Sequence, residues 1–275
     1  MILRVVGDRS HSISITYSRM RNGQKMELQG LDIDVVRKGS GQPLLLLHGG
    51  GGPIAQMPFA DRLAEKFEII APTHPGFNGS KIPKHFTRID DLVYLYLDLL
   101  DELDLTDVVL MGFSMGGWAA AEMAVANSSR LSRLILVDSV GVKVGGREDR
   151  DIADVFALPG EKLAEIMFHD KSLAPNPADI PDEQLQIVAG NRTALGVYTW
   201  DPYMHNPKLP HRLHRIKIPT NFIWGASDGL VTLEYGEKFC AMIDGATMTV
   251  ITEAGHSPQM EQPDAFVNAV FEVAA

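Results

Sequence analysis

The sequence has a single cysteine, Cys240, in 275 residues. One thiol cannot form an intrachain disulfide, a redox pair or a cysteine-ligated zinc cluster. The chain also has no apolar stretch long enough to span a bilayer, and polar residues at 8–11 interrupt the region where a signal peptide would be apolar. We therefore expect a protein of the reducing cytoplasm with no membrane partner.

Clustered basic residues are scarce as well. The 25 Lys and Arg are outnumbered by 35 Asp and Glu, which gives a formal net charge of −10 and argues against nucleic acid as a partner. The phosphate-binding patterns G-x-x-x-x-G-K and G-x-G-x-x-G are absent, and we expect no cofactor. His211 and His214 are spaced like two metal ligands, but no carboxylate or third histidine stands beside them, so we expect no metal.

The chain does contain the motif G-x-S-x-G, as G-F-S-M-G at 112–116. An apolar run precedes it and small residues follow it, which is typical of a strand, a tight turn and a helix that present Ser114 as a nucleophile. The same pattern recurs at 225–229, so the letters alone do not choose between Ser114 and Ser227. Large apolar residues soon follow Ser227, and we interpret it as part of the loop that delivers Asp228.

A nucleophilic serine in this setting needs an acid and then a histidine further along the chain. Asp228 and His256 satisfy that order, and each follows an apolar, strand-like run. Asp138, at the end of the preceding strand-like run, is a competing acid, and the pattern favours Asp228. The expected catalytic residues are therefore Ser114, Asp228 and His256.

A glycine-rich segment supplies the remaining element of such a site. Four consecutive leucines lead directly into H-G-G-G-G-P at 48–53. Glycine lets the backbone approach a developing oxyanion closely. We expect the N–H groups of Gly50 or Gly51, together with that of Met115, to form an oxyanion hole. We interpret His48 as a support for this loop rather than as a titrating group.

Taken together, these segments resemble the α/β-hydrolase superfamily from about Leu31 to the C-terminus. The motifs that carry the resemblance are H-G-G-G-G-P at 48–53, P-G-F-N-G-S at 75–80, G-F-S-M-G-G at 112–117, W-G-A-S-D at 224–228 and G-H-S at 255–257. The resemblance implies an α/β fold with a mostly parallel central sheet, helices on both faces and an inserted helical cap. Hydrophobic residues make up 45% of the chain, enough for one large core.

The domain organisation that we expect has four parts. They are an N-terminal extension at 1–25, a first part of the hydrolase core at 26–140, a helical cap at 141–213 and a second part of the core at 214–275. Alternating residues at 12–17 predict an edge strand within the extension. The sequence leaves open whether this strand packs on the sheet, forms an arm to a second subunit in a homodimer, or is disordered.

Local patterns predict most of the elements. The alternation at 31–36 and the turn at 39–43 predict a hairpin that leads into a central strand at 44–47. Further strands are expected at 68–71, 108–111, 134–138, 220–224 and 247–251. Helices are expected at 59–67, 89–103, 161–168, 182–188 and 264–271.

The resemblance implies a serine hydrolase that works through an acyl-enzyme, and we expect carboxylic esters of small to medium apolar molecules as substrates. Carbon–carbon bond hydrolases of meta-cleavage products share several of the motifs. They commonly have asparagine before the nucleophile and tryptophan after the histidine, where this chain has Phe113 and Ser257. This activity remains the alternative, together with a non-catalytic ligand-binding homologue.

The expected cap offers aromatic and methionine side chains for a substrate pocket, although such residues often simply fill a core. Together with Phe113, the candidates are Met167, Tyr198, Trp200 and Met204. If they line the pocket, it accepts a medium-sized apolar ester.

Overall fold

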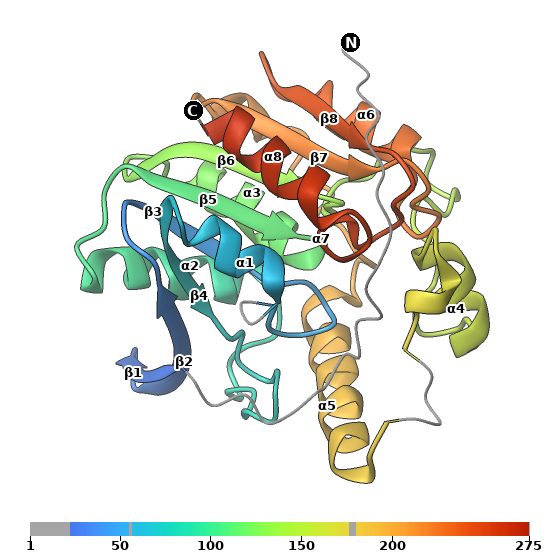
Figure 1. Cartoon of the computed structure of the whole chain (residues 1–275), viewed down its shortest axis with the longest axis horizontal. Helices are drawn as coiled ribbons and strands as arrows, with labels where there is room; N and C mark the ends of the chain where they lie inside the picture. Colours follow the sequence, from blue (N-terminus) through green and yellow to red (C-terminus); the bar gives the residue numbers. More distant parts are fainter. Residues whose placement is uncertain (1–22, 55–56, 176–179, 275) are drawn as a thin grey trace.

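Eight strands form one sheet in the order β1-β2-β4-β3-β5-β6-β7-β8 (Figure 1). The computed structural model describes residues 23–54, 57–175 and 180–274. The strands are β1 (Gln24–Leu28), β2 (Leu31–Lys38), β3 (Gln42–Leu47), β4 (Phe67–Pro72), β5 (Val108–Phe113), β6 (Leu131–Val137), β7 (Thr220–Gly225) and β8 (Thr247–Ile251). The strand predicted at 12–17, and most of the predicted extension, lie outside the described residues.

The sheet is mostly parallel, as the resemblance implies. All the neighbouring pairs from β4 through β3, β5, β6 and β7 to β8 are parallel. The antiparallel pairs among the described strands are β1 with β2 and β2 with β4. Parallel strands end at the same edge of a sheet, so the loops that follow β3, β5, β7 and β8 gather at one edge.

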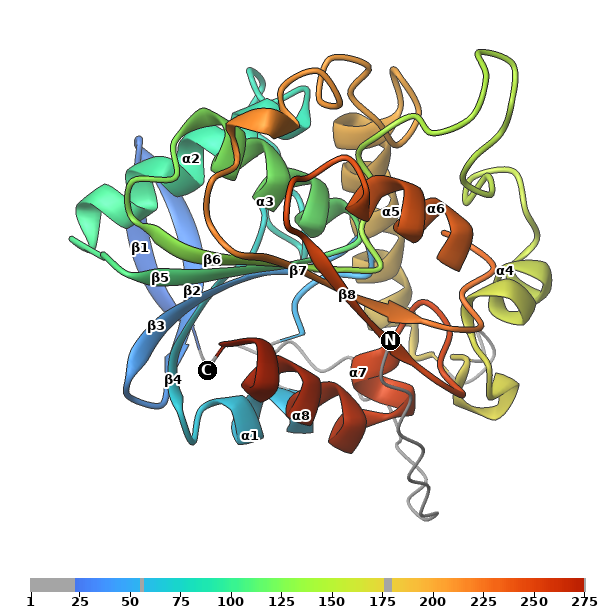
Figure 2. The same cartoon turned by 90° about the horizontal axis from the view of Figure 1, so that it is seen from above.

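Helices cover both faces of the sheet (Figure 2). One face carries α1 (Pro58–Leu63), α7 (Pro258–Glu261) and α8 (Pro263–Ala274). The other face carries α2 (Ile89–Glu102), α3 (Met115–Ala126) and α6 (Leu233–Cys240). No helix within the described residues combines the length and the apolar character needed to cross a membrane.

The central strands are buried on both faces because each face is covered by helices. The four leucines at 44–47 are at most 1% exposed. Leu45 and Leu47 belong to the core layer that contains α2 and α3, whereas Leu44 and Leu46 belong to the layer that contains α1 and α8. Successive side chains of a strand point to opposite faces, so one short apolar run contributes to both layers.

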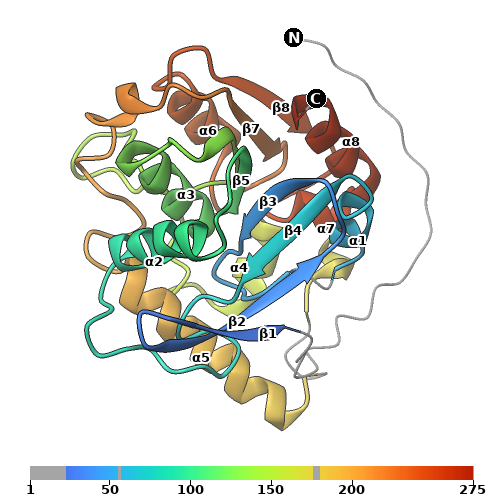
Figure 3. The same cartoon turned by 90° about the vertical axis from the view of Figure 1, so that its left-hand side faces the viewer.

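The predicted hairpin between the segments at 31–36 and 44–47 is wrong. Strand β4 lies between β2 and β3, and β3 pairs in parallel with β4 and β5 instead (Figure 3). The turn that follows β2 crosses the start of β4 so closely that a β-carbon at Gly39 would overlap the Phe67 carbonyl oxygen. Strands of a sheet that helices cover on both faces commonly pair in parallel, and this pairing overrides the short connection between β2 and β3.

The predicted helix at 59–67 ends early, at Leu63, because Phe67 already begins β4. The predicted helix at 182–188 is instead much longer and continues to Thr199 as α5 (Asp182–Thr199).

The connection between β6 and β7, residues 138–219, is called the β6–β7 insertion below. It contains α4 (Gly160–Met167), the 3-10 turn η1 (Lys171–Leu173), α5 and the 3-10 turn η3 (Leu213–Arg215). Its described residues form no strand, only an isolated bridge between Gly141 and His205. Figure 1 shows α4 and α5 at the end of the sheet where β5 and β6 terminate.

We predict that Tyr235→Phe destabilises the protein. Tyr235 in α6 is 2% exposed, and its hydroxyl accepts from the Val142 N–H at 3.0 Å and donates to the Val142 carbonyl at 2.9 Å. The variant leaves both buried backbone groups without a partner, which costs about 1–3 kcal/mol of the free energy of unfolding in a urea titration. Tyr94→Phe, at a side chain that is 62% exposed on α2, is the control. Equal stability of the two variants would contradict the prediction.

Candidate functional site

Ser114 stands between the end of β5 and the start of α3 in a strained backbone conformation. Its φ of 51° and ψ of −116° lie in a region that residues with a β-carbon rarely adopt. Its N–H donates to the Val137 carbonyl at 2.9 Å, and its carbonyl accepts from the Trp118 N–H at 3.1 Å. This is the strand, turn and helix arrangement that the motif predicts.

Glycines are required around Ser114 because three backbone segments meet there. A β-carbon at Gly112 would overlap the Gly116 carbonyl, and one at Gly116 would overlap the carbonyls of Leu47 and His48 at the end of β3. A β-carbon at Gly49 would lie 3.2 Å from that of Ser114. The segment at 48–53, called the glycine loop below, therefore lies directly against Ser114.

Three backbone N–H groups near Ser114 are free to bind an anion. Those of Gly50, Gly51 and Met115 have no hydrogen-bond acceptor in the part of the chain that the structure describes. Met115 is the first residue of α3, and a helix N-terminus favours negative charge. A β-carbon at Gly51 would have open space around it.

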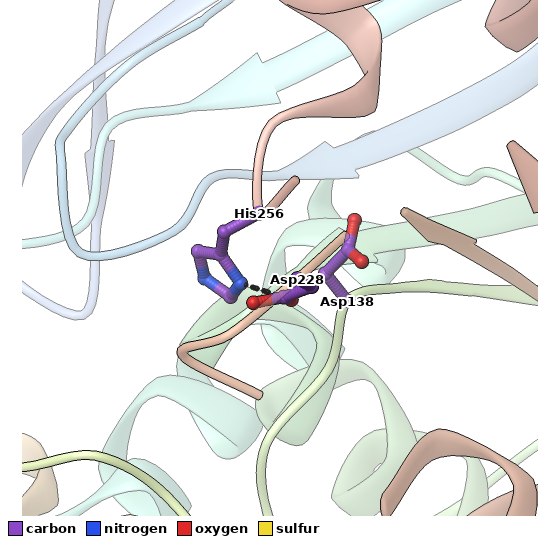
Figure 4. Close-up of side chains that lie close together, drawn as sticks. All are labelled: Asp138, Asp228 and His256. Atoms are coloured by element: carbon purple, nitrogen blue, oxygen red, sulfur yellow. Dashed lines mark hydrogen bonds and ion pairs between the residues drawn. The ribbon is translucent and has the colours of Figure 1, made fainter. Parts of the chain in front are cut away.

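His256 and Asp228 form a buried hydrogen-bonded pair (Figure 4). His256 Nδ1 donates to Asp228 Oδ2 at 2.7 Å, and their side chains are 6% and 0% exposed. The other oxygen, Oδ1, accepts from the N–H groups of Leu230 and Val231, each at 2.9 Å. These bonds fix the carboxylate, and they leave the imidazole with its lone pair on Nε2.

The three candidate catalytic residues follow different strands of the same parallel sheet. Ser114 follows β5, Asp228 follows β7 and His256 follows β8, so all three lie at the edge where these strands end. No hydrogen bond joins Ser114 to His256 in this structure. Catalytic hydrogen bonds are often long in unliganded enzymes and shorten when substrate binds.

Asp138, the competing acid, contacts this pair without bonding to His256. Its side chain is buried, and Oδ1 accepts from the Gly225 N–H at 2.9 Å. Oδ2 is buried too, and no N–H or hydroxyl donor among the described residues reaches it. Burial first, and then the charge of Asp228, raise the pKa of Asp138 well above its usual range. Asp138 therefore holds its proton to a higher pH than an ordinary carboxyl group does.

The same three side chains resemble a metal site in one respect. Asp138, Asp228 and His256 each place a ligand atom within 4.8 Å of the others (Figure 4). Both oxygens of Asp228 and Nδ1 of His256 are already engaged in hydrogen bonds, however. A proton on Asp138 is enough to relieve the repulsion between the two carboxyl groups.

Close packing accounts for the two glycines of the second G-x-S-x-G motif, at 225–229. A β-carbon at Gly225 would overlap the Gly255 carbonyl, and one at Gly229 would lie 3.0 Å from the Ile166 carbonyl. Ser227 is exposed, and its hydroxyl hydrogen-bonds to His169 Nδ1 at 2.9 Å. The next helix begins only at Leu233, so Ser227 lacks the turn that Ser114 occupies.

A buried histidine pair supports the glycine loop. His48 Nδ1 donates to the Gly49 carbonyl at 2.8 Å, and Nε2 accepts from the His74 N–H at 3.0 Å. His74 Nε2 donates to the His48 carbonyl at 2.8 Å, and Nδ1 accepts from the Tyr96 hydroxyl. Both rings are neutral in this network. Burial lowers the pKa of His48 well below its usual value and that of His74 to about 4.

The candidate pocket residues occupy different environments. Met167 contacts the His256 loop through its backbone, because its carbonyl accepts from the His256 N–H at 2.6 Å. Tyr198 is buried and donates its hydroxyl to the Pro75 carbonyl at 2.9 Å. Met204 is buried at 4% exposure.

Phe113 and Trp200 do not fit the expected pocket. The Phe113 ring is 6% exposed and packs 5.9 Å from Phe59 and 5.8 Å from Phe266, in the core beneath α1 and α8. Trp200 is 60% exposed and lines a surface groove of about 400 Å³ with Thr87 and Arg88. Core packing and surface exposure account for these two side chains better than substrate contact.

Sequence reasoning missed Asn191, a buried residue of α5 that bonds to the glycine loop. A single asparagine in a helix gives no sequence signal for such a role. His211 and His214 are both exposed and join no metal-like group among the described residues.

A protein-family model and several known proteins are similar to this chain. The model of the Alpha/beta hydrolase family matches residues 44–269. The chain is 27% identical over 252 residues to the dihydrolipoyllysine-residue acetyltransferase component of the acetoin cleaving system of Cupriavidus necator, covering 88% of this chain and 66% of that protein. It therefore spans slightly less than two thirds of that relative.

Two further proteins are similar to this chain over most of their own length. The chain is 28% identical over 254 residues to the 2-hydroxy-6-oxononadienedioate/2-hydroxy-6-oxononatrienedioate hydrolase of Cupriavidus pinatubonensis, covering 84% of this chain and 86% of that one. It superimposes on the structure of a thermophilic esterase from Thermogutta terrifontis with a TM-score of 0.72 and 23% identity, covering 92% and 100% of the two chains. The esterase shares the fold.

The buried histidine pair predicts a loss of stability in acid. Because the pKa of His74 is about 4 in the folded protein and about 6.5 when unfolded, the unfolded chain takes up a proton first as the pH falls. The contribution of the neutral His74 ring to the free energy of unfolding is complete above about pH 6.5. It falls by about 3 kcal/mol as the pH is lowered from about 6.5 to about 4. Urea titrations across this range should show that the free energy of unfolding falls less steeply with pH for His74→Gln than for the wild type. An equally steep decline would contradict the prediction.

Proposed function

Because the chain belongs to the alpha/beta hydrolase family, we propose that this hydrolase cleaves carboxylic esters of small to medium apolar molecules with Ser114 as its nucleophile. The observation that carries the proposal is the strained φ of 51° at Ser114, at the junction of β5 and α3. Backbone strain persists only where the surroundings enforce it, and it is concentrated at functional sites. The bonded pair of Asp228 and His256 at the same sheet edge supports it.

In the first half of the reaction, His256 Nε2 takes the proton of Ser114 Oγ as that oxygen attacks the ester carbonyl. Asp228 holds the Nδ1–H tautomer and stabilises the imidazolium that forms. The imidazolium then gives its proton to the departing alkoxide oxygen, and the C–O bond breaks. The products of this half are a free alcohol and an acyl-Ser114.

The negative charge that develops on the carbonyl oxygen needs donors that are already oriented. The free N–H groups of Met115 and of Gly50 or Gly51 are suited to this role, and the loss of one such donor typically costs about 3 kcal/mol of transition-state stabilisation. In the second half, His256 deprotonates a water molecule that attacks the acyl carbonyl. The carboxylic acid leaves, and Ser114 regains its proton.

Carbon–carbon bond hydrolysis of meta-cleavage products is the second candidate, favoured by the similarity to the hydrolase of Cupriavidus pinatubonensis. At the position before the nucleophile, where that subgroup commonly has a polar asparagine, Phe113 packs in the core. Ser257 replaces the tryptophan that commonly follows the histidine. These two positions favour the ester.

We predict that Ser114→Ala abolishes both ester hydrolysis and labelling by a fluorophosphonate, because the turn at 112–116 has no other serine, threonine or cysteine side chain. The kcat/KM for a p-nitrophenyl ester series should fall by roughly 10³-fold or more. Ser227→Ala is the matched control, since it removes the serine of the second motif, and it should stay within about threefold of the wild type.

Three outcomes would change the assignment. A folded wild type that neither labels nor hydrolyses any substrate would favour a non-catalytic ligand-binding protein. Faster turnover of a meta-cleavage product than of every ester would favour the carbon–carbon activity. Loss of labelling in Ser227→Ala alone would transfer the nucleophile to the second motif.

The two neighbouring carboxyl groups should respond differently to amide substitution. Asp228→Asn removes the charge that stabilises the imidazolium and should lower kcat by about 10⁴-fold. Asp138→Asn keeps a neutral group that can donate to Asp228, so kcat should stay within about fivefold of the wild type. Ester hydrolysis by both variants tests this. A larger loss in Asp138→Asn than in Asp228→Asn would make Asp138 the catalytic acid.

A further inference from the structure

We propose that Asn191, in the β6–β7 insertion, is a positioning residue that holds the glycine loop in the shape that binds the oxyanion. The inference rests on the proposed function and extends it to a residue that does not touch the reacting atoms. Helix α5 thereby helps to form a site whose other members all follow strands of the sheet.

Asn191 uses both ends of its amide to join two loops. Its Nδ2 donates to the Gly51 carbonyl at 2.9 Å, and its Oδ1 accepts from the Asn78 N–H at 2.8 Å. The side chain is buried at 4% exposure, so water does not readily replace these bonds. A single buried amide therefore links α5, the glycine loop and the P-G-F-N segment.

The loop is shaped to accept this side chain. Gly52 has a φ of +107°, and a β-carbon there would lie 2.7 Å from Asn191 Nδ2. The amide fills the space that a larger residue at Gly52 would need. Only an uncharged group with one donor and one acceptor satisfies both partners, because Asp lacks the donor and Leu lacks both.

Other residues on the same face of α5 hold the same two loops. A β-carbon at Gly50 would lie 2.9 Å from Leu195 Cδ1, so Leu195 packs over the Gly50 backbone. Tyr198 donates to the Pro75 carbonyl at 2.9 Å. Positions 191, 195 and 198 lie on one helix face. Asn191 is the member that hydrogen-bonds to the glycine loop itself.

The hydrogen bond from Asn191 to the Gly51 carbonyl restrains the glycine loop without engaging the loop's free N–H groups. With its carbonyl held by Asn191, the Gly51–Gly52 peptide cannot rotate freely. Next to it, the N–H groups of Gly50 and Gly51 stay without an acceptor and available to the oxyanion. A glycine-rich loop without such a restraint samples many backbone conformations. Loss of the restraint should weaken binding of the transition state more than binding of the ester.

The test compares Asn191→Ala and Asn191→Asp with Asn221→Ala. Asn221 is 8% exposed near the amino end of β7, and its amide also makes two bonds, with Arg133 at 3.0 Å and Thr247 at 2.6 Å. Asn191→Asp keeps the size and the bond to Asn78 but loses the donor to Gly51. It therefore retains the packing if Asn191→Ala folds poorly.

Each variant is measured for thermal unfolding, for kcat and KM on a p-nitrophenyl ester, and for the rate of labelling by a fluorophosphonate. We expect both Asn191 variants to lose about 10- to 100-fold in kcat and to label more slowly, with KM changed less than threefold. Asn221→Ala should lose stability but keep its kcat.

Two results overturn the inference, and they are distinguishable. If the wild type hydrolyses esters and Asn191→Asp keeps its kcat, or loses it only in proportion to its folded fraction, Asn191 has a merely structural role. If the wild type hydrolyses no ester and takes up no fluorophosphonate, the proposed function fails and the inference fails with it.

Discussion

The structure of the site depends on the close contact between the end of β3 and the start of α3. The carbonyls of Leu47 and His48 lie where a β-carbon of residue 116 would have to be. This contact forces Ser114 into its left-handed conformation, and it brings the glycine loop beside the serine. A strained turn is maintained only by the packing around it, which here is the dense double-sided core of the parallel sheet.

Buried polar groups hold the remaining loops, and each has a partner that fixes its protonation or its orientation. The two histidines beneath the glycine loop are neutral because burial disfavours their charge. Burial, and then the charge of Asp228, likewise raise the pKa of Asp138. At the same edge of the sheet, the buried Asp228 carboxyl group is hydrogen-bonded to the imidazole of His256.

The sequence predicted what depends on local pattern and failed where distant segments decide. The strand at 247–251 has the predicted bounds, and the strand–turn–helix at Ser114 follows from its glycines and neighbours. The pairing of β3 with β4 could not be predicted, because it depends on burial across the sheet. The roles of Asn191 and Trp200 escaped for a related reason. Asn191 lies in α5 and Trp200 directly follows it, and the polar and apolar residues of this helix give no clear helical stripe that would tell its inner face from its outer one.

Helix α4 of the β6–β7 insertion contacts the loops of Gly229 and His256 through main-chain carbonyls, whereas α5 contacts the glycine loop through side chains. The carbonyl of Ile166 accepts from the Gly229 N–H at 2.8 Å, and that of Met167 accepts from the His256 N–H at 2.6 Å. Contacts made by carbonyl groups depend on the path of the backbone and are nearly independent of residue type. A substitution in α4 that preserves the path of the backbone can therefore leave the histidine in its place.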